Sequence, residues 1–271
     1  MFVRPGAVAF YFSSYVRALV RSVRPVWHAR PDRLWEVDAL RGVAILMMVV
    51  YHITWDLYGL GGRDIPIYGP FWTVWQRVTA GLFIGLVGVS LHLRAQKFYR
   101  QGGFTVWPFV QRALVIGTWA MVITGVTYVF QPDEVVRFGV LHLIGTSLLL
   151  ALPFVRVPAL SLLVGIGLLV LPEVTSWRHH WTWLEWVGMI QAPHPAFDYF
   201  PLVPWMGGVF IGVAVGAFLF PKGVPRWSST SPPICLGRWL QVAGQNALLI
   251  YLLHQPLIIA ALMLLGYVRL S

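Results

Sequence analysis

Apolar runs long enough to cross a lipid bilayer dominate this chain of 271 residues. A membrane-spanning helix needs about 20 mostly apolar residues to cross a hydrocarbon core of about 30 Å. Runs that approach or exceed this length lie at about residues 40–58, 72–93, 107–130, 138–155, 157–172, 201–220 and 239–265. The sequence therefore predicts an all-α fold, a polytopic membrane helix bundle with about seven transmembrane helices.

The low content of charged residues supports this class of protein. Hydrophobic residues make up 58% of the chain and charged residues only 11%, whereas soluble domains carry about 25% charged residues. The formal net charge is +10, but the basic residues lie in short loops beside the apolar runs, which indicates membrane topology rather than a nucleic-acid partner. The single Cys235 excludes an internal disulfide and a multi-cysteine metal site.

Residues 1–32 form a basic segment that differs from the rest of the chain. Arg17, Arg21 and Arg24 interrupt its apolar stretches, which is not the pattern of a conventional signal peptide. We expect an amphipathic interfacial helix at about residues 9–23, lying on the cytosolic leaflet. Residues 33–271 then form one transmembrane domain. Because Lys and Arg favour the cytosolic side of a membrane, the amino terminus is predicted to be cytosolic.

The first apolar run is the richest in polar side chains. Asp38 and Arg41 lie at its start, and His52 and Asp56 lie towards its end. On a regular helix Arg41 and His52 are separated by about 16 Å and point within about 20° of each other. Asp56 follows His52 by one helical turn, so its carboxylate can lie beside the imidazole and support it as a general base.

A structural interpretation of the same residues stays open. Arg41 can be a positive-inside anchor that pairs with Asp38, and His52 can hydrogen-bond between packed helices. Asp56 favours a functional site, because an acid inside a membrane-spanning run is costly unless it has a partner. Arg77, near the start of the second run, either neutralises Asp56 or binds substrate.

His52, His142 and His254 lie within apolar runs and could converge in the bundle. Convergence suits a catalytic site, but it also suits heme b if two imidazoles oppose each other across facing helices. No metal site is expected, because no close pair of His, Cys or Asp ligands recurs. Trp205 is either an interface anchor or a stacking surface for a sugar.

Five segments carry a resemblance to a known family. Residues 33–45 (RLWEVDALRGVAI), followed by Tyr51 and His52, resemble the opening of bacterial proteins related to heparan-alpha-glucosaminide N-acetyltransferase. Arg41 and His52 are also similar to the signature of Arg, ten residues and His in membrane acyltransferases that O-acetylate bacterial surface glycans. The other segments follow in the expected order: 83–90 (FIGLVGVS), 138–145 (FGVLHLIG), 198–208 (DYFPLVPWMGG) and 244–256 (GQNALLIYLLHQP).

The resemblance implies a membrane enzyme that takes an acetyl group from cytosolic acetyl-CoA and delivers it to a glycan or lipid-linked acceptor on the far side. It places Arg41 towards the CoA thioester and His52 towards the acceptor. In the last run, Asn246, Tyr251 and His254 match residues of the family, and His254 would join the catalytic site. The eukaryotic branch has Asn at the position of His52 and a catalytic His in its first luminal loop, whereas residues 59–71 here contain no histidine.

We therefore expect an acetyl-CoA-dependent acyltransferase in the bacterial cytoplasmic membrane. His52 is expected to be the base, oriented by Asp56, or a nucleophile that carries the acetyl group as acetyl-His. The donor phosphates would bind on the basic cytosolic side, near Arg41 with its neighbour Asp38 and near Arg94. Candidate substrate-binding residues are Arg77, His142, Asn246, Tyr251 and Trp205.

Two questions remain open from the sequence. The chain has fewer predicted helices than the larger relatives, so a second copy could complete the substrate groove in a homo-oligomer. A proton-coupled transporter or flippase is the alternative function, in which His52, Asp56 and Arg77 would form the proton path.

Overall fold

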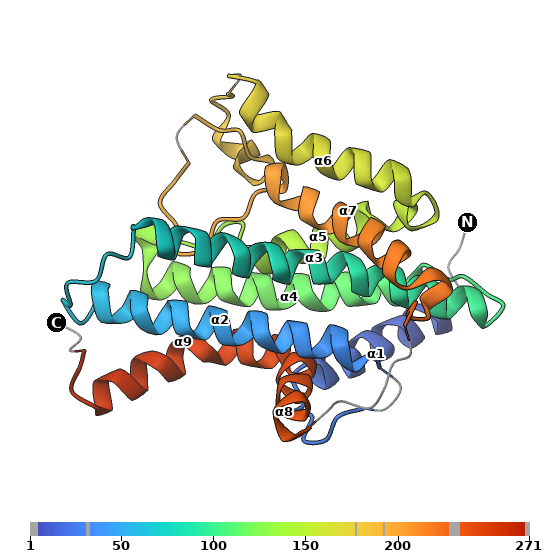
Figure 1. Ribbon diagram of the computed structural model, residues 1–271, viewed down its shortest axis with the longest axis horizontal. Helices are drawn as coiled ribbons and strands as arrows, with labels where there is room; N and C mark the ends of the chain where they lie inside the picture. Colours follow the sequence, from blue (N-terminus) through green and yellow to red (C-terminus); the bar gives the residue numbers. More distant parts are fainter. Residues whose placement is uncertain (1–4, 31–32, 177, 192, 228–233, 269–271) are drawn as a thin grey trace. The chain divides into compact units, whose positions relative to one another are not determined.

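The computed structural model describes residues 5–30, 33–176, 178–191, 193–227 and 234–268. Within these residues the chain folds into α-helices and short 3-10 turns, with no strand (Figure 1). The α-helices are α1 (Pro5–Ser22), α2 (Trp35–Gly59), α3 (Pro70–Arg100), α4 (Trp107–Phe130), α5 (Val140–Leu150), α6 (Pro158–Val174), α7 (Leu202–Leu219), α8 (Ile234–Gln245) and α9 (Ala247–Leu264). The 3-10 turns are η1 (Pro132–Glu134), η2 (Leu152–Arg156), η3 (Thr182–Val187) and η4 (Pro221–Gly223).

The prediction of an all-α membrane helix bundle is confirmed. Five helices, α2, α3, α4, α7 and α9, are long and apolar enough to cross a membrane, and α5 and α6 are shorter apolar helices. Each predicted run therefore contains an apolar helix. The last run, 239–265, differs from the prediction because it is divided at Asn246 into α8 and α9.

Contacts divide the chain into two compact units, described here separately. The first contains α1 up to Leu19, α3 from Ile84 onwards, and the chain from α4 to α7. The second contains Val20–Phe83, which includes α2 and the first part of α3, together with α8 and α9.

In the second unit, glycines allow α2 and α8 to approach closely. A Cβ on Gly42 would lie 2.1 Å from the Leu240 carbonyl oxygen, and a Cβ on Gly244 would lie 1.8 Å from the Asp38 carbonyl oxygen. Both distances are far below a van der Waals contact, so any larger residue would force the helices apart. On α9, Ile258 and Leu262 form a buried cluster with Val268, against which Val49, Ile53 and Leu57 of α2 pack.

In the first unit, glycines also allow close packing at two other helix pairs. A Cβ on Gly88 of α3 would lie 2.0 Å from the Val209 carbonyl oxygen of α7, and one on Gly207 of α7 would lie 2.6 Å from the Gly165 carbonyl oxygen of α6. Helices α6 and α7 lie side by side (Figure 1). Small residues let membrane helices pack with their backbones close together. Gly88 lies in the segment FIGLVGVS and Gly207 in DYFPLVPWMGG, so these two segments have a packing role.

Candidate functional site: a histidine pair on α2 and α9

His52 of α2 and His254 of α9 lie in contact within the second unit. Their ring centroids are 4.8 Å apart and the ring planes meet at 64°. The structure therefore brings together the two histidines that the sequence proposed for the catalytic site. Two rings in direct contact leave no room for an iron porphyrin between them, so this pair is not arranged as opposed heme ligands.

Local hydrogen bonding selects one tautomer of His254. Its Nδ1 lies 2.6 Å from the backbone carbonyl oxygen of Tyr251, and only a protonated nitrogen can donate to that oxygen. A neutral ring then carries its lone pair on Nε2. That Nε2 is buried and has no hydrogen-bond partner among the described residues. An imidazole with one nitrogen held by the backbone and the other free is arranged as a base. The Tyr251 ring also lies beside it, with centroids 5.6 Å apart.

Asp56 is bound by the residue that follows His254. Its side chain is almost fully buried, and Nε2 of Gln255 donates to both carboxylate oxygens, at 2.8 and 3.1 Å. The described residues give Asp56 no hydrogen bond from His52, although the two were expected to pair. Gln255 Oε1, like His254 Nε2, is buried without a partner. Consecutive residues of α9 thus present two unsatisfied acceptor atoms.

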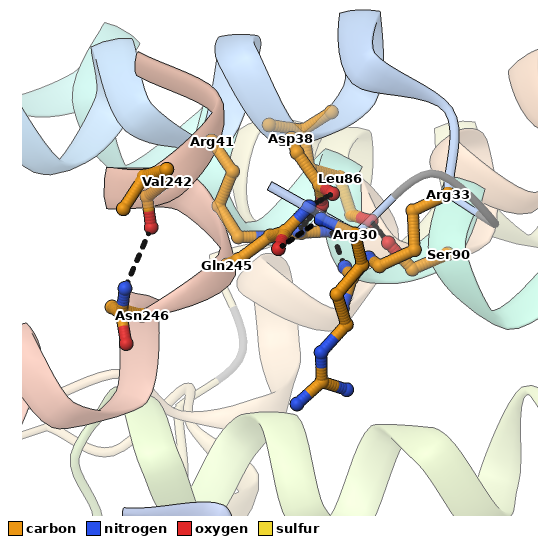
Figure 2. Close-up of polar contacts among 9 residues, drawn as sticks. All are labelled: Arg30, Arg33, Asp38, Arg41, Leu86, Ser90, Val242, Gln245 and Asn246. Carbon is orange, nitrogen blue, oxygen red and sulfur yellow. Dashed lines mark hydrogen bonds and ion pairs between the residues drawn. The ribbon is translucent and has the colours of Figure 1, made fainter. Parts of the chain in front are cut away.

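The other end of α2 holds a network around Asp38 (Figure 2). Oδ1 of Asp38 accepts hydrogen bonds from Arg33 Nη2 and Arg41 Nη1, each at 2.6 Å, and Oδ2 accepts one from Gln245 Nε2 at 3.0 Å. Asp38 is 1% exposed. Arg41 therefore has the contacts of a structural anchor at the start of α2, and its role towards the donor stays a prediction.

Asn246 marks the break between α8 and α9. Its Oδ1 accepts a hydrogen bond from the Val26 backbone N–H at 2.8 Å, and its Nδ2 donates to the carbonyl oxygens of Val26 and Val242 at 2.8 and 2.9 Å (Figure 2 shows the bond to Val242). The neighbouring Gln245 Oε1 accepts from the Arg30 N–H at 3.2 Å. Asn246 therefore binds the segment between α1 and α2 to the point where α8 ends and α9 begins. This is a structural role.

In the first unit, both ring nitrogens of His142 serve local structure. Nδ1 accepts from the Gly139 N–H at 3.1 Å, which caps the start of α5. Nε2 donates to Thr124 Oγ1 at 3.3 Å, because the hydroxyl proton of Thr124 is donated to the Val136 carbonyl oxygen at 2.6 Å. Both ring nitrogens are thus engaged within the chain and His142 caps α5, while its role towards a substrate stays a prediction.

The same cap uses Asp198, whose Oδ2 accepts from the Val140 N–H at 3.0 Å. A Cβ on Gly139 would lie 2.2 Å from that oxygen, so a larger residue would displace the Asp198 carboxylate from the cap. A carboxylate at a helix N-terminus is also favoured by the helix dipole. Gly139 and Asp198 belong to two different segments of the resemblance, FGVLHLIG and DYFPLVPWMGG, so these segments meet at the start of α5.

The remaining candidates are placed as follows. Arg94, in the first unit, lies over the Phe109 ring at 5.5 Å. Arg77, in the second unit, is exposed, and no ion pair joins it to Asp56 within the described residues. The Trp205 ring packs against Phe200 with centroids 4.7 Å apart. The positions of these three residues do not identify a substrate.

The segment between α6 and α7 is held by Glu185 of η3. Its carboxylate accepts from the His194 backbone N–H at 2.8 Å and lies 3.0 Å from His194 Nδ1. Tyr199 Oη donates to the Glu185 backbone carbonyl oxygen at 2.8 Å. Burial, with the nearby Glu185 charge, raises the pKa of Tyr199 to about 12, so this phenol stays a hydrogen-bond donor at neutral pH.

Gln255 and Gln245 are the residues that sequence reasoning missed. Both lie in GQNALLIYLLHQP but were not singled out, because a glutamine carries no charge to attract notice. A signal was present: an amide side chain inside an apolar helix needs a partner, and Gln255 follows His254 directly.

The fold and this site define a class of protein: a polytopic membrane protein whose polar centre is a histidine pair between two packed helices. A comparison with known families also identifies the family of this chain. The chain matches the family described as heparan-alpha-glucosaminide N-acetyltransferase, catalytic, over residues 33–256, and it belongs to that family. The resemblance of the five segments is thereby confirmed, and the family is one of membrane acetyltransferases. No match was found among the curated proteins or among the solved structures.

Proposed function

We propose that this protein transfers an acetyl group from acetyl-CoA to an amine or hydroxyl of a glycan or lipid-linked acceptor, and that His52 and His254 form the reacting centre. One observation carries the proposal: His254 and Gln255 are consecutive residues of α9, and His254 Nε2 and Gln255 Oε1 are both buried and without partners among the described residues. Leaving a buried acceptor unsatisfied costs about 1–3 kcal/mol. A bound acceptor with N–H or O–H groups would remove that cost.

The histidine pair supports a direct transfer. Nε2 of His254 takes the proton from the acceptor nitrogen or oxygen as that atom bonds to the acetyl carbonyl carbon. The carbon–sulfur bond of the thioester then breaks, and the CoA thiolate leaves with the proton that His254 has taken up. His52, whose ring touches His254, has no hydrogen bond to the described residues, so its N–H is available to the carbonyl oxygen on which negative charge develops.

The two histidines have different roles in this proposal. The sequence favoured His52 as the base, held by Asp56. The geometry supports His254 instead, since the Tyr251 carbonyl holds its tautomer and Asp56 is bound by Gln255.

The topology is part of the same proposal. The amino terminus lies in the cytosol of a bacterium, and the enzyme spans the inner membrane. Acetyl-CoA approaches from the side of the basic loops, and the acceptor from the other side. A second copy that completes the groove is a further part, which cross-linking in the membrane would test.

A transfer assay tests the proposal. Purified protein in lipid nanodiscs is given acetyl-CoA labelled in the acetyl group, and both CoA release and labelled acceptor are measured, with glucosamine and short glycans as acceptors. We expect wild-type protein to consume acetyl-CoA, His254→Asn to lose transfer, and His180→Asn, which changes an exposed loop histidine, to retain it. Flux of a glycan into liposomes without CoA release would instead establish the transporter, and the proposal would fall.

A further inference from the structure

An open, shallow cavity of about 560 Å³ lies at the surface of the first unit. It is lined by the later turns of α3, by η2 with the start of α6, and by the end of α7 with η4; its polar lining residues are His92, Gln96, Tyr99, Arg156 and Lys222. Ligand sites for small molecules usually have volumes of about 300–1,000 Å³. The cavity is large enough for a nucleotide or a lipid headgroup.

The chain around this cavity is basic and contains no acid. Residues 84–106, 150–165 and 214–227 contain no Asp or Glu, while they contain Arg94, Lys97, Arg100, Arg156, Lys222 and Arg226. Like charges gathered on one part of a surface raise the local concentration of anions. Such a cavity favours a ligand with more than one negative charge.

Arg156 is oriented by neutral groups. Its Nε donates to Tyr99 Oη at 2.9 Å, and its guanidinium carbon lies 5.2 Å and 5.3 Å from the ring centroids of Tyr99 and Phe104. These two rings stack, with centroids 4.9 Å apart and planes within 20°. No ion pair with a carboxylate is found for Arg156 in the described part of the chain. A planar guanidinium held at one nitrogen, with its terminal N–H groups uncommitted to an acid, matches the bidentate geometry of phosphate.

A buried polar atom without a partner belongs to the same lining. His92 is 2% exposed, and its Nε2 lies 3.2 Å from the Phe220 carbonyl oxygen, to which it donates. Its Nδ1 is buried and has no hydrogen-bond partner among the described residues. On a neutral ring this nitrogen is a hydrogen-bond acceptor.

We infer that this cavity binds the phosphate group of a phosphate ester, with Arg156 and Lys222 as the charged contacts. Two sources share that chemistry. One is the phosphorylated nucleotide end of CoA, and this source depends on the proposed acetyl transfer. The other is the headgroup of an anionic phospholipid, which does not depend on it.

Binding is measured with full-length protein in nanodiscs of phosphatidylcholine, using adenosine 3′,5′-bisphosphate in equilibrium dialysis. We expect Arg156→Gln and Lys222→Gln each to weaken binding about tenfold or more, since a charge-assisted hydrogen bond is lost. The matched control is Arg226→Gln, which removes a charge from the same basic segments. Arg226 lies over the Phe218 ring at 4.6 Å and is not part of the lining, so its loss should change binding by less than about threefold.

A second arm separates the lipid from the nucleotide. Melting temperatures are compared in nanodiscs with and without phosphatidylglycerol. If the anionic lipid raises the melting temperature of wild type and Arg226→Gln but not of Arg156→Gln or Lys222→Gln, while the bisphosphate does not bind, the ligand is the lipid. If neither probe acts, or if Arg226→Gln weakens binding as much as the lining variants, the inference is wrong.

The proposed function can fail without this inference failing. His254→Asn should bind the bisphosphate like wild type, because it changes a different unit of the chain. Protein that binds the phosphate through Arg156 but never transfers acetyl would refute only the transfer. Protein that transfers acetyl normally in both lining variants and binds neither probe would refute only the phosphate site.

Discussion

The two ends of α2 each bury an aspartate, and the two aspartates differ in how far the protein satisfies their surroundings. Asp38 receives two guanidinium groups and one amide, so its charge is compensated by the chain itself. Asp56 receives only the Gln255 amide, and beside it two acceptor atoms lack partners. Buried polar groups are normally hydrogen-bonded. The Asp38 carboxylate is therefore satisfied by the chain itself, although Trp35 Nε1 near it is buried without a hydrogen-bond partner among the described residues. At the Asp56 end, the proposed function assigns the unsatisfied atoms of His254 and Gln255 to a ligand.

The largest effect on activity is expected at His254, next to the residue that binds Asp56. His254→Ala should lower the rate of acetyl transfer by about 10²–10⁴-fold, the usual contribution of a general base. The variant also loses the hydrogen bond to the Tyr251 carbonyl and the ring contact with His52, so a stability loss of about 1 kcal/mol is expected beside the much larger loss of rate. Initial rates and melting temperatures measured on the same preparation check this. Near-normal turnover would remove His254 as the base.

Variants at Asp38 should change the free energy of unfolding of the protein instead of its activity. Asp38→Ala leaves the guanidinium groups of Arg33 and Arg41 without their carboxylate, and breaking a buried ion pair costs about 3–5 kcal/mol. Because the Arg33 side chain is 38% exposed, water compensates part of this loss, and about 3 kcal/mol is expected. Unfolding in detergent measures the change. Unaltered stability would show that the hydrogen bonds of Asp38 do not stabilise the start of α2.

Arg41→Lys sharpens the comparison, because the sequence assigned Arg41 to the donor. Lysine keeps the charge but loses the planar fork that reaches Asp38. We expect a stability loss of about 1 kcal/mol and an unchanged affinity for acetyl-CoA. The opposite result, a weakened affinity at unchanged melting temperature, would return Arg41 to the donor site.

The smallest effect is expected for Asp56→Asn. The asparagine oxygen can still accept a hydrogen bond from Gln255, and the tautomer of His254 depends on the Tyr251 carbonyl and not on Asp56. Transfer should fall by less than about tenfold. A fall of more than about tenfold would support the hypothesis that Asp56 acts through His52, as the spacing on α2 first predicted.

Helix positions were predictable from the sequence, since the length and hydrophobicity of a run determine whether it can cross a membrane. The break at Asn246 was not, because the side chain bonds to Val26, which is 220 residues away. The resemblance paired His52 with His254 correctly as neighbours. It could not supply the tautomer of His254 or the partner of Asp56, because both depend on side-chain directions in the folded helices. The capping role of His142 was within reach, since Gly139 and His142 have the spacing of a helix cap.

The bond between Asp38 and Gln245 has a consequence for how the protein is made. The two residues are 207 positions apart, so a ribosome has released α2 long before Gln245 is synthesised. During that interval the carboxylate has only its arginine neighbours, and the segment that Asn246 will fasten stays unattached. The contacts between α2 and α8 therefore form only after α2 has already been inserted into the membrane. A chain truncated before α8 should insert its early helices yet remain a substrate for quality-control proteases, because the contacts of Gln245 and Asn246 form only once α8 has been made.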